Sequence, residues 1–83
     1  MNIDVLSFEL TPDGKELHIH GDSAGLRRLA AALHRLATSD TPGHEHLFTP
    51  AWGGNDLSQE AQGGANGDHV IDSVTLHCRP SEP

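Results

Sequence analysis

Histidine is the residue type in this sequence best suited to chemistry, and four of the seven histidines form H-x-H pairs. His18 with His20 and His44 with His46 are each predicted to lie on a strand. Because side chains alternate along a strand, both imidazoles of a pair point to the same face. Two neutral imidazoles at that spacing can ligate Zn²⁺, with an acid such as Glu45 nearby. The pattern has no Cys pair and no fixed third ligand. The alternative is that these histidines are solvated polar groups, and we predict no metal site and no cofactor.

Other groups that catalyse reactions are not arranged for catalysis in the sequence. The single cysteine, Cys78, excludes an internal disulfide. On a strand it would point away from its neighbour His77, so the two do not form a nucleophile–base pair. The acids are scattered over turns and strand faces, and the glycines follow no phosphate-binding pattern. We therefore predict that the protein is not an enzyme and has no catalytic residues.

Charge is the strongest signal in the composition. The 83 residues include twelve acidic and five basic ones, for a net charge of −7. Only segment 23–37 is basic, with three arginines and no acid. An acidic surface repels nucleic acid and attracts a basic protein; the alternative is that the charge only keeps a small protein soluble. No signal peptide and no apolar stretch near the roughly 20 residues of a membrane span are visible. We expect a cytoplasmic protein that binds neither nucleic acid nor membrane.

Apolar periodicity predicts four strands and one helix. The strands cover 3–10, 16–20, 44–49 and 69–78, and the helix begins after Asp22 or Ser23 as N-cap and frays at 38–40. The facing of the third strand stays open between Leu47 inward and His46 with Phe48 inward. The residues predicted to face the core are Leu6, Phe8, Leu10, Leu17 and Ile19 of the first two strands, Leu26, Leu29, Ala30, Leu33, Leu36 and Ala37 of the helix, and Val70, Val74, Leu76 and Cys78 of the last strand.

The order β-β-α-β-β predicts an α+β fold. One helix must bury its apolar stripe on one sheet face, so we expect a two-layer sandwich with a mostly antiparallel four-stranded sheet. A single domain would span 1–79, followed by a disordered tail at 80–83. The opposite sheet face would mix polar and apolar groups and is either solvated or the contact of a homodimer. Its expected members are Ile3, Val5, His18, His20 and Ile71.

The long connection 50–68 holds the only tryptophan and five glycines. Connections of this length are uncommon in compact domains and are often functional. Trp52, beside Gly53-Gly54, has two interpretations. It either caps the open end of the core or is an exposed aromatic of the kind enriched at the centre of binding sites.

At this point the sequence resembles the immunity protein 32 family of bacterial polymorphic toxin systems. Residues 46–58, HLFTPAWGGNDLS, are similar to the family pattern H-L-M-T-P-x-W-G-G-x-E-L-[ST], and 25–29, GLRRL, supports the likeness. Phe48 replaces the usual Met, Asp56 the usual Glu, and Asp72-Ser73 a commoner Asn-His pair. The resemblance implies a small α+β protein that binds and neutralises a cognate toxin, often a nuclease, without catalytic residues.

These observations combine into one functional hypothesis. The chain is expected to be an immunity protein that occludes a basic region of a protein toxin with an acidic surface around Trp52. The alternatives are a homodimeric structural or regulatory protein and a metal-binding module that uses the H-x-H pairs. The residues predicted to bind the partner are Trp52, Asn55, Asp56, Glu60 and Glu45.

Overall fold

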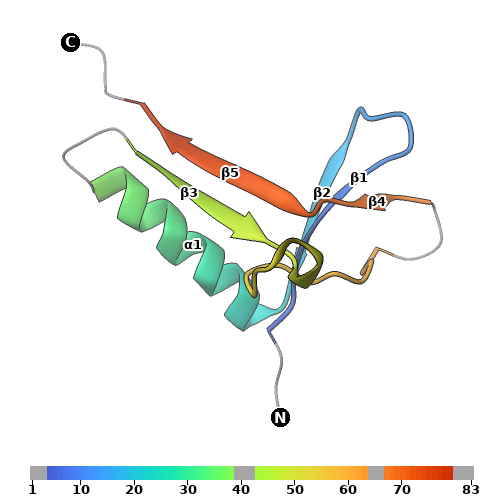
Figure 1. Ribbon diagram of the computed structural model, residues 1–83, viewed down its shortest axis with the longest axis horizontal. Helices are drawn as coiled ribbons and strands as arrows, with labels where there is room; N and C mark the ends of the chain where they lie inside the picture. Colours follow the sequence, from blue (N-terminus) through green and yellow to red (C-terminus); the bar gives the residue numbers. More distant parts are fainter. Residues whose placement is uncertain (1–3, 39–42, 64–66, 80–83) are drawn as a thin grey trace.

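The computed structural model describes residues 4–38, 43–63 and 67–79. In these residues the chain forms five strands, one α-helix and one 3-10 turn, which confirms the α+β class (Figure 1). The strands expected at 3–10 and 44–49 shift by a few residues, and the one expected at 69–78 is interrupted. The elements are β1 (Leu6–Leu10), β2 (Leu17–Gly21), α1 (Ser23–Thr38), β3 (Gly43–Phe48), η1 (Pro50–Trp52), β4 (His69–Val70) and β5 (Ser73–Cys78). The tail expected at 80–83 lies outside the described residues.

The strands form two antiparallel sheets, so the prediction of one four-stranded sheet was wrong. One sheet has the order β2-β1-β4 and the other pairs β3 with β5. The last part of the chain changes its pairing partner between Ile71 and Asp72. Ile71 still donates its N–H to the carbonyl of Phe8, 2.8 Å away, whereas the Asp72 carbonyl accepts from Thr49 at 3.0 Å. Neighbouring residues of an extended chain direct their backbone groups to opposite edges. The β1 and β3 strands therefore lie on opposite edges of one continuous stretch.

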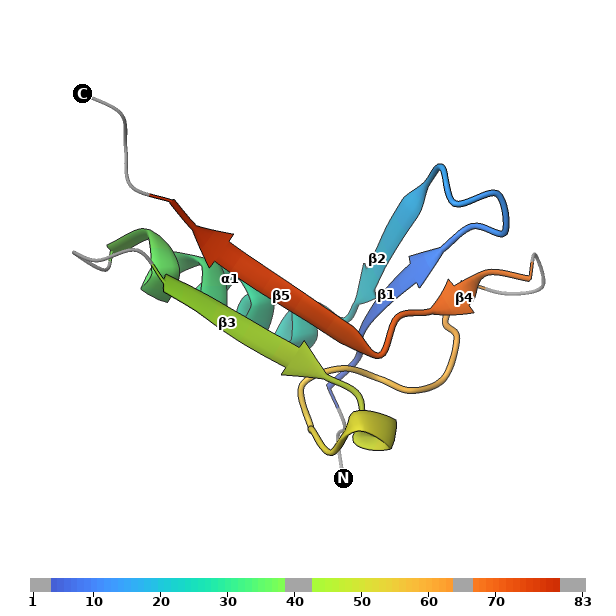
Figure 2. The same ribbon diagram turned by 45° about the horizontal axis from the view of Figure 1, so that its top comes forward.

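The sheets separate because a loop segment, Asp56–Ser58, lies between the end of β3 and the start of β1. The N–H groups of Asp56 and Leu57 donate to the carbonyl of Phe48, at 3.2 and 3.1 Å. The N–H of Ser58 donates to the Leu6 carbonyl at 2.6 Å, and its hydroxyl accepts from the Leu6 N–H at 3.2 Å. A segment bonded on both sides in this way fills the position that strand pairing between β1 and β5 would need. The β1–β2 hairpin therefore diverges from β3 and β5 (Figure 2).

The core lies under this segment. Leu57 is only 3% exposed and packs with Leu6, Phe8 and Leu47. Leu47 therefore faces inward, which settles the facing of the third strand, and His46 and Phe48 take the other face of β3. Leu6 and Phe8 are buried as predicted.

Helix α1 begins as predicted but is rotated relative to its predicted facing. The Asp22 side chain caps it by accepting from the N–H of Gly25 at 2.7 Å. Gly25 itself has no room for a side chain, since a Cβ there would lie 1.7 Å from the Val5 carbonyl oxygen. Four residues of the predicted stripe remain exposed instead of buried: Leu26, Ala30, Leu33 and Ala37.

Two ion pairs accompany this rotation. Arg28 binds Asp4, with Nε and Oδ2 2.8 Å apart, and Arg35 binds Glu45 of β3 through two hydrogen bonds of 2.7 and 3.2 Å. Arg28 thus faces the segment before β1, and Arg35 faces β3. The apolar arc of the helix is only half covered, and its uncovered part is on the flank opposite these arginines.

The predicted inward facing of Leu17 and Ile19 was also wrong. By register they share a sheet face with the buried Phe8 and Leu6, yet they are 54% and 46% exposed. The α1 helix follows β3 and β5, and the β1–β2 hairpin extends beyond the area that it covers (Figure 2). Strand alternation predicts which sheet face a residue lies on, but it does not predict whether the helix covers that part of the face.

Leu57→Ala should destabilise the protein by about 2–5 kcal/mol, because it removes a buried side chain from the segment that joins both sheets. Urea unfolding measures the loss. Leu17→Ala deletes the same atoms at an exposed position and should change the free energy of unfolding by only about 0.5 kcal/mol. Equal losses in both variants would contradict the central place given to Leu57.

Candidate binding surface around Trp52

The turn that carries Trp52 is built on Thr49, which is fully buried. The Thr49 hydroxyl donates to the Asp72 carboxylate at 2.7 Å. Its carbonyl accepts from the N–H groups of Trp52 and Gly54, at 2.9 and 3.0 Å. Pro50 opens the short η1 helix, where its missing N–H costs no hydrogen bond. The backbone under Trp52 is therefore held by one buried residue, whose carbonyl binds the turn and whose hydroxyl binds Asp72.

The turn requires glycine at positions 53 and 54 for two different structural reasons. Gly53 adopts a φ of +85°, a left-handed conformation that favours glycine. Gly54 passes so close to β3 that a Cβ on it would lie 2.5 Å from the Cβ of Phe48. The turn therefore packs against the end of β3 with no side chain between them.

Trp52 is 60% exposed, so its interpretation as a cap of the core was wrong. Its ring stacks on Phe48, with centroids 6.4 Å apart and planes 19° apart. Phe48 in turn stacks on His46 at 5.5 Å, and His46 meets His44 edge-on at 4.9 Å. These four side chains form a continuous row on the outer face of β3, which we call the aromatic row. Because each ring supports the next, the exposed indole is held in place by its neighbours.

Sequence reasoning missed most of this row. Alternation at 44, 46 and 48 followed by Trp52 was the available signal, but the facing of this strand was open. His77 of β5 joins the row's face, with its ring centroid 5.9 Å from that of His44. His46 Nδ1 also lies 3.1 Å from the Thr75 hydroxyl.

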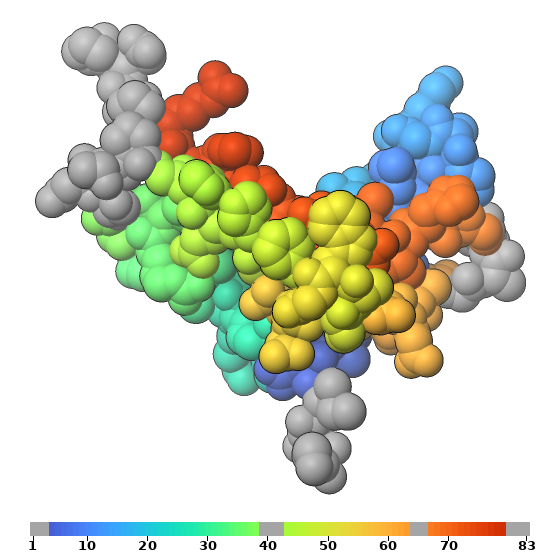
Figure 3. All heavy atoms as spheres, in the orientation of Figure 1, coloured from blue at the N-terminus to red at the C-terminus, as the bar shows by residue number. Residues whose placement is uncertain are grey.

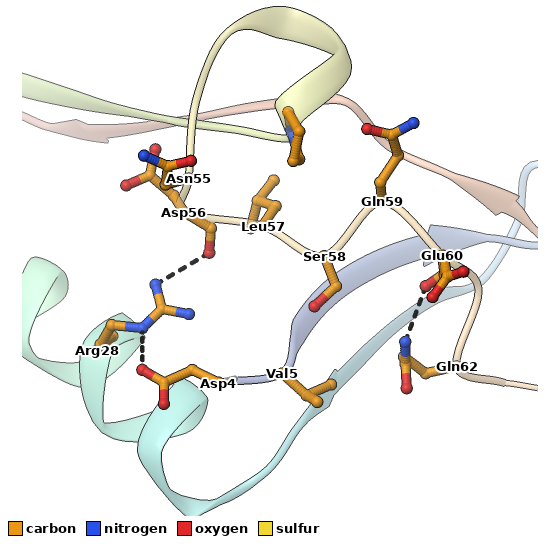
Figure 4. Close-up of a pocket in the computed structure, with 11 residues that line it drawn as sticks. Asp4, Val5, Arg28, Asn55, Asp56, Leu57, Ser58, Gln59, Glu60 and Gln62 are labelled. Atoms are coloured by element: carbon orange, nitrogen blue, oxygen red, sulfur yellow. Dashed lines mark hydrogen bonds and ion pairs between the residues drawn. The ribbon is translucent and has the colours of Figure 1, made fainter. Parts of the chain in front are cut away.

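Beside the turn lies a groove of about 600 Å³ between the start of α1 and the loop 55–62 (Figure 4). Arg28 reaches into it, donating from Nε to Asp4 at 2.8 Å and from Nη1 to the Asp56 carbonyl at 3.0 Å. Glu60 lines the same groove. The groove therefore carries three carboxylates and one guanidinium.

The five residues predicted to bind a partner fall into two groups. Trp52, Asn55 and Glu60 are exposed. The other two already have partners within the chain: the Glu45 carboxylate binds Arg35, and the Asp56 carboxylate accepts from the N–H of Phe48 at 3.2 Å. Asn55, Asp56 and Glu60 come together along the groove, while Glu45 lies on the helix side of β3.

The two H-x-H pairs lie on different sheets, His18 and His20 on β2 and His44 and His46 on β3. Within the described residues, no group of three or more His, Cys, Asp and Glu side chains is placed to hold a metal ion. In the same part of the chain, no helix has the length and apolar character needed to cross a membrane.

The loop that carries Glu60 is anchored by Glu9, a carboxylate with no solvent exposure. It accepts hydrogen bonds from the Ser7 hydroxyl at 2.6 Å and from the N–H groups of Gln62 and Gly63 at 2.7 and 3.2 Å. Its Oε1 also lies 3.9 Å from Nε2 of His20. Burial raises the pKa of Glu9, but these hydrogen bonds and the nearby imidazole outweigh burial, so the pKa lies below its ordinary value of 4.5.

The fold and this surface define a small α+β protein with a rigid, exposed, aromatic-centred loop, an arrangement suited to protein recognition. The family model of immunity protein 32 matches residues 16–74. The chain therefore belongs to the immunity protein 32 family. No curated protein and no solved structure matches the chain.

Glu9→Gln should reduce the dependence of stability on pH. Since the folded-state pKa of Glu9 is below its unfolded value, its contribution is fully present above about pH 4.5 and is lost as the pH falls through the folded-state value. The stability difference between wild type and Glu9→Gln should therefore shrink between about pH 6 and about pH 3 in urea titrations. Glu16→Gln, at an exposed carboxylate, is the matched control. A difference that stays constant over this range for Glu9→Gln would contradict the anchor.

Proposed function

We propose that this protein is a cytoplasmic immunity protein that binds a cognate protein toxin and blocks it by occlusion, without a catalytic step. Family membership supports this class of function, and the surface around Trp52 supplies a means of contact. The toxin class that fits best carries a basic surface, as nucleases do where they bind phosphates. An acidic protein would associate rapidly with such a surface.

The observation that carries the proposal is the exposure of Trp52 on a fixed backbone. A large aromatic side chain that is 60% exposed has most of its apolar area still to bury. The buried Thr49 and the stacked Phe48 already order the turn and the ring, so binding costs little further conformational entropy. Ordered exposed tryptophans are among the residues whose removal most weakens protein complexes.

The groove beside Trp52 adds electrostatic selectivity to the proposal. Asp4, Asp56 and Glu60 line this groove together with Arg28, so acidic residues outnumber basic ones there. A lysine or arginine of the toxin entering this groove would find carboxylate partners at its rim. The proposal thus rests on Trp52, Asn55 and Glu60 as contact residues. Asp56 and Glu45 act by positioning, since Asp56 holds the end of β3 and Glu45 holds Arg35.

Trp52→Ala should weaken binding to the toxin encoded by the neighbouring gene by about 2 kcal/mol or more, roughly thirtyfold, because the central apolar contact is lost. Isothermal titration against a catalytically inactive form of that toxin measures the affinity. The matched control is Leu17→Ala, a second exposed apolar side chain on the distant β2 strand, which should bind as wild type does.

Trp52 is the only tryptophan in the chain, so its fluorescence reports on the contact directly. With a toxin form that lacks tryptophan, complex formation should shift the emission to shorter wavelength as the indole leaves water. Tight binding with unchanged emission and an unaffected Trp52→Ala variant would place the contact elsewhere. If the protein does not bind this toxin at micromolar concentration, the proposed function itself is contradicted.

A further inference from the structure

One strand of the smaller sheet has a free edge. The only strand that pairs with β5 in the described part of the chain is β3. Since Asp72 bonds to Thr49 on the β3 side, alternation directs the backbone groups of Ser73, Thr75 and His77 to the opposite edge. Edge strands are usually protected by a proline, a lysine or a bulge. The sequence of β5, SVTLHC, contains neither proline nor lysine.

The length and position of the free edge of β5 would allow it to pair with the same edge of a second copy. The β1 strand occupies the same edge as far as Ile71, so the free stretch begins at Asp72 and runs to Cys78. Its midpoint is Thr75. An antiparallel pairing centred there would set Thr75 opposite its own copy and Val74 opposite Leu76 of the copy. Both Thr–Thr and aliphatic cross-strand pairs are favourable.

The helix behind β5 has a matching uncovered flank. Leu26 and Leu33 are 46% and 48% exposed, and Ala30 and Ala37 extend the same flank. This flank is opposite the arginine side that binds β3, so it lies next to the free edge of β5. The space-filling view shows a hollow between β5 and the β1–β2 hairpin (Figure 3).

Pairing of two copies would space their strands and their helices at compatible distances. Pairing β5 with a second β5 would give the strand order β3-β5-β5-β3, with one helix behind each β3–β5 pair. Two strand spacings separate the centres of these pairs by about 10 Å. Helices that pack against each other are also about 8–10 Å apart. Strand pairing would therefore bring the exposed leucine flanks of two antiparallel helices into contact.

Charge favours a second copy over a basic partner at this edge. The protein carries −7 in total, yet residues 73–79 contain no acid and the helix contains only arginines as charged residues. Two such surfaces can approach each other without bringing carboxylates together. A basic toxin would find no carboxylate on residues 73–79.

We propose that the occupant of this edge is a second copy of the chain, paired about a two-fold axis at Thr75. The contact is separate from the Trp52 surface and does not depend on the proposed function. It also replaces the sheet-face dimer that the sequence suggested, because the split of the sheet removes that continuous face.

Light scattering coupled to gel filtration tests this without toxin. At about 100 μM chain, enough to populate a dimer of micromolar Kd, wild type should have twice the mass of one chain. Thr75→Pro removes an N–H that points to the free edge and leaves the pairing with β3 intact, so it should weaken the dimer at least tenfold. Thr75→Val keeps that N–H and should remain dimeric.

A second pair of variants tests the helix flank. Leu33→Glu places a charge against its own copy and should give a monomer. Ala31→Glu adds the same charge at an exposed position on the arginine flank and should leave the dimer intact. A monomeric wild type would overturn the proposal, as would a dimer that survives both Thr75→Pro and Leu33→Glu. A monomer whose toxin affinity falls in Thr75→Pro would assign the edge to the toxin and would equally overturn it.

Discussion

The structure depends on the segment Asp56–Ser58, which is hydrogen-bonded to β3 on one side and to β1 on the other. These backbone groups would otherwise be left unpaired at two strand ends, at a cost of about 1–3 kcal/mol each when buried. Leu57 at the centre of the segment joins the core of both sheets. The loop is thus part of the framework, and the exposed turn just before it inherits that rigidity.

The same segment determines what stays uncovered. Because it occupies the edge of β1 that would otherwise pair with β5, the hairpin must diverge, and β5 keeps one free edge. The separation also moves Leu17 and Ile19 beyond the reach of α1. The exposure of Leu17 and Ile19 and the free edge of β5 therefore share one origin in the split of the sheet.

The sequence predicted local structure well and tertiary coverage poorly. The N-cap at Asp22, one of the two candidates, the β-β-α order of the first three elements, and the burial of Leu6 and Phe8 were predicted correctly from local sequence patterns. In residues 69–78 the apolar alternation is broken only at Asp72, and that single acid was not enough to predict a change of pairing partner at Ile71-Asp72. That change is set by Thr49, more than twenty positions away. The helix facing failed for a related reason. The close approach of Gly25 to Val5 and the ion pairs of Arg28 and Arg35 are contacts with other segments, and the apolar stripe of the helix does not reveal them.

At the candidate site, residue type was more informative than charge. The sequence drew attention to Trp52 and its glycines because a lone tryptophan beside a tight turn is unusual. The structure shows the ring exposed and a need for both glycines, and the role of Trp52 in binding stays a proposal. The role of each acidic residue was harder to predict. The residue type does not show whether a carboxylate is free to bind a partner or is already bonded within the chain. Asp56 binds the backbone of Phe48, and Glu45 binds the side chain of Arg35. Residues 46–58, which resemble the immunity protein 32 family pattern, therefore contain two structurally different parts. Leu57 and Ser58 build the segment that splits the sheet, and Trp52 is the part that this framework holds out to solvent.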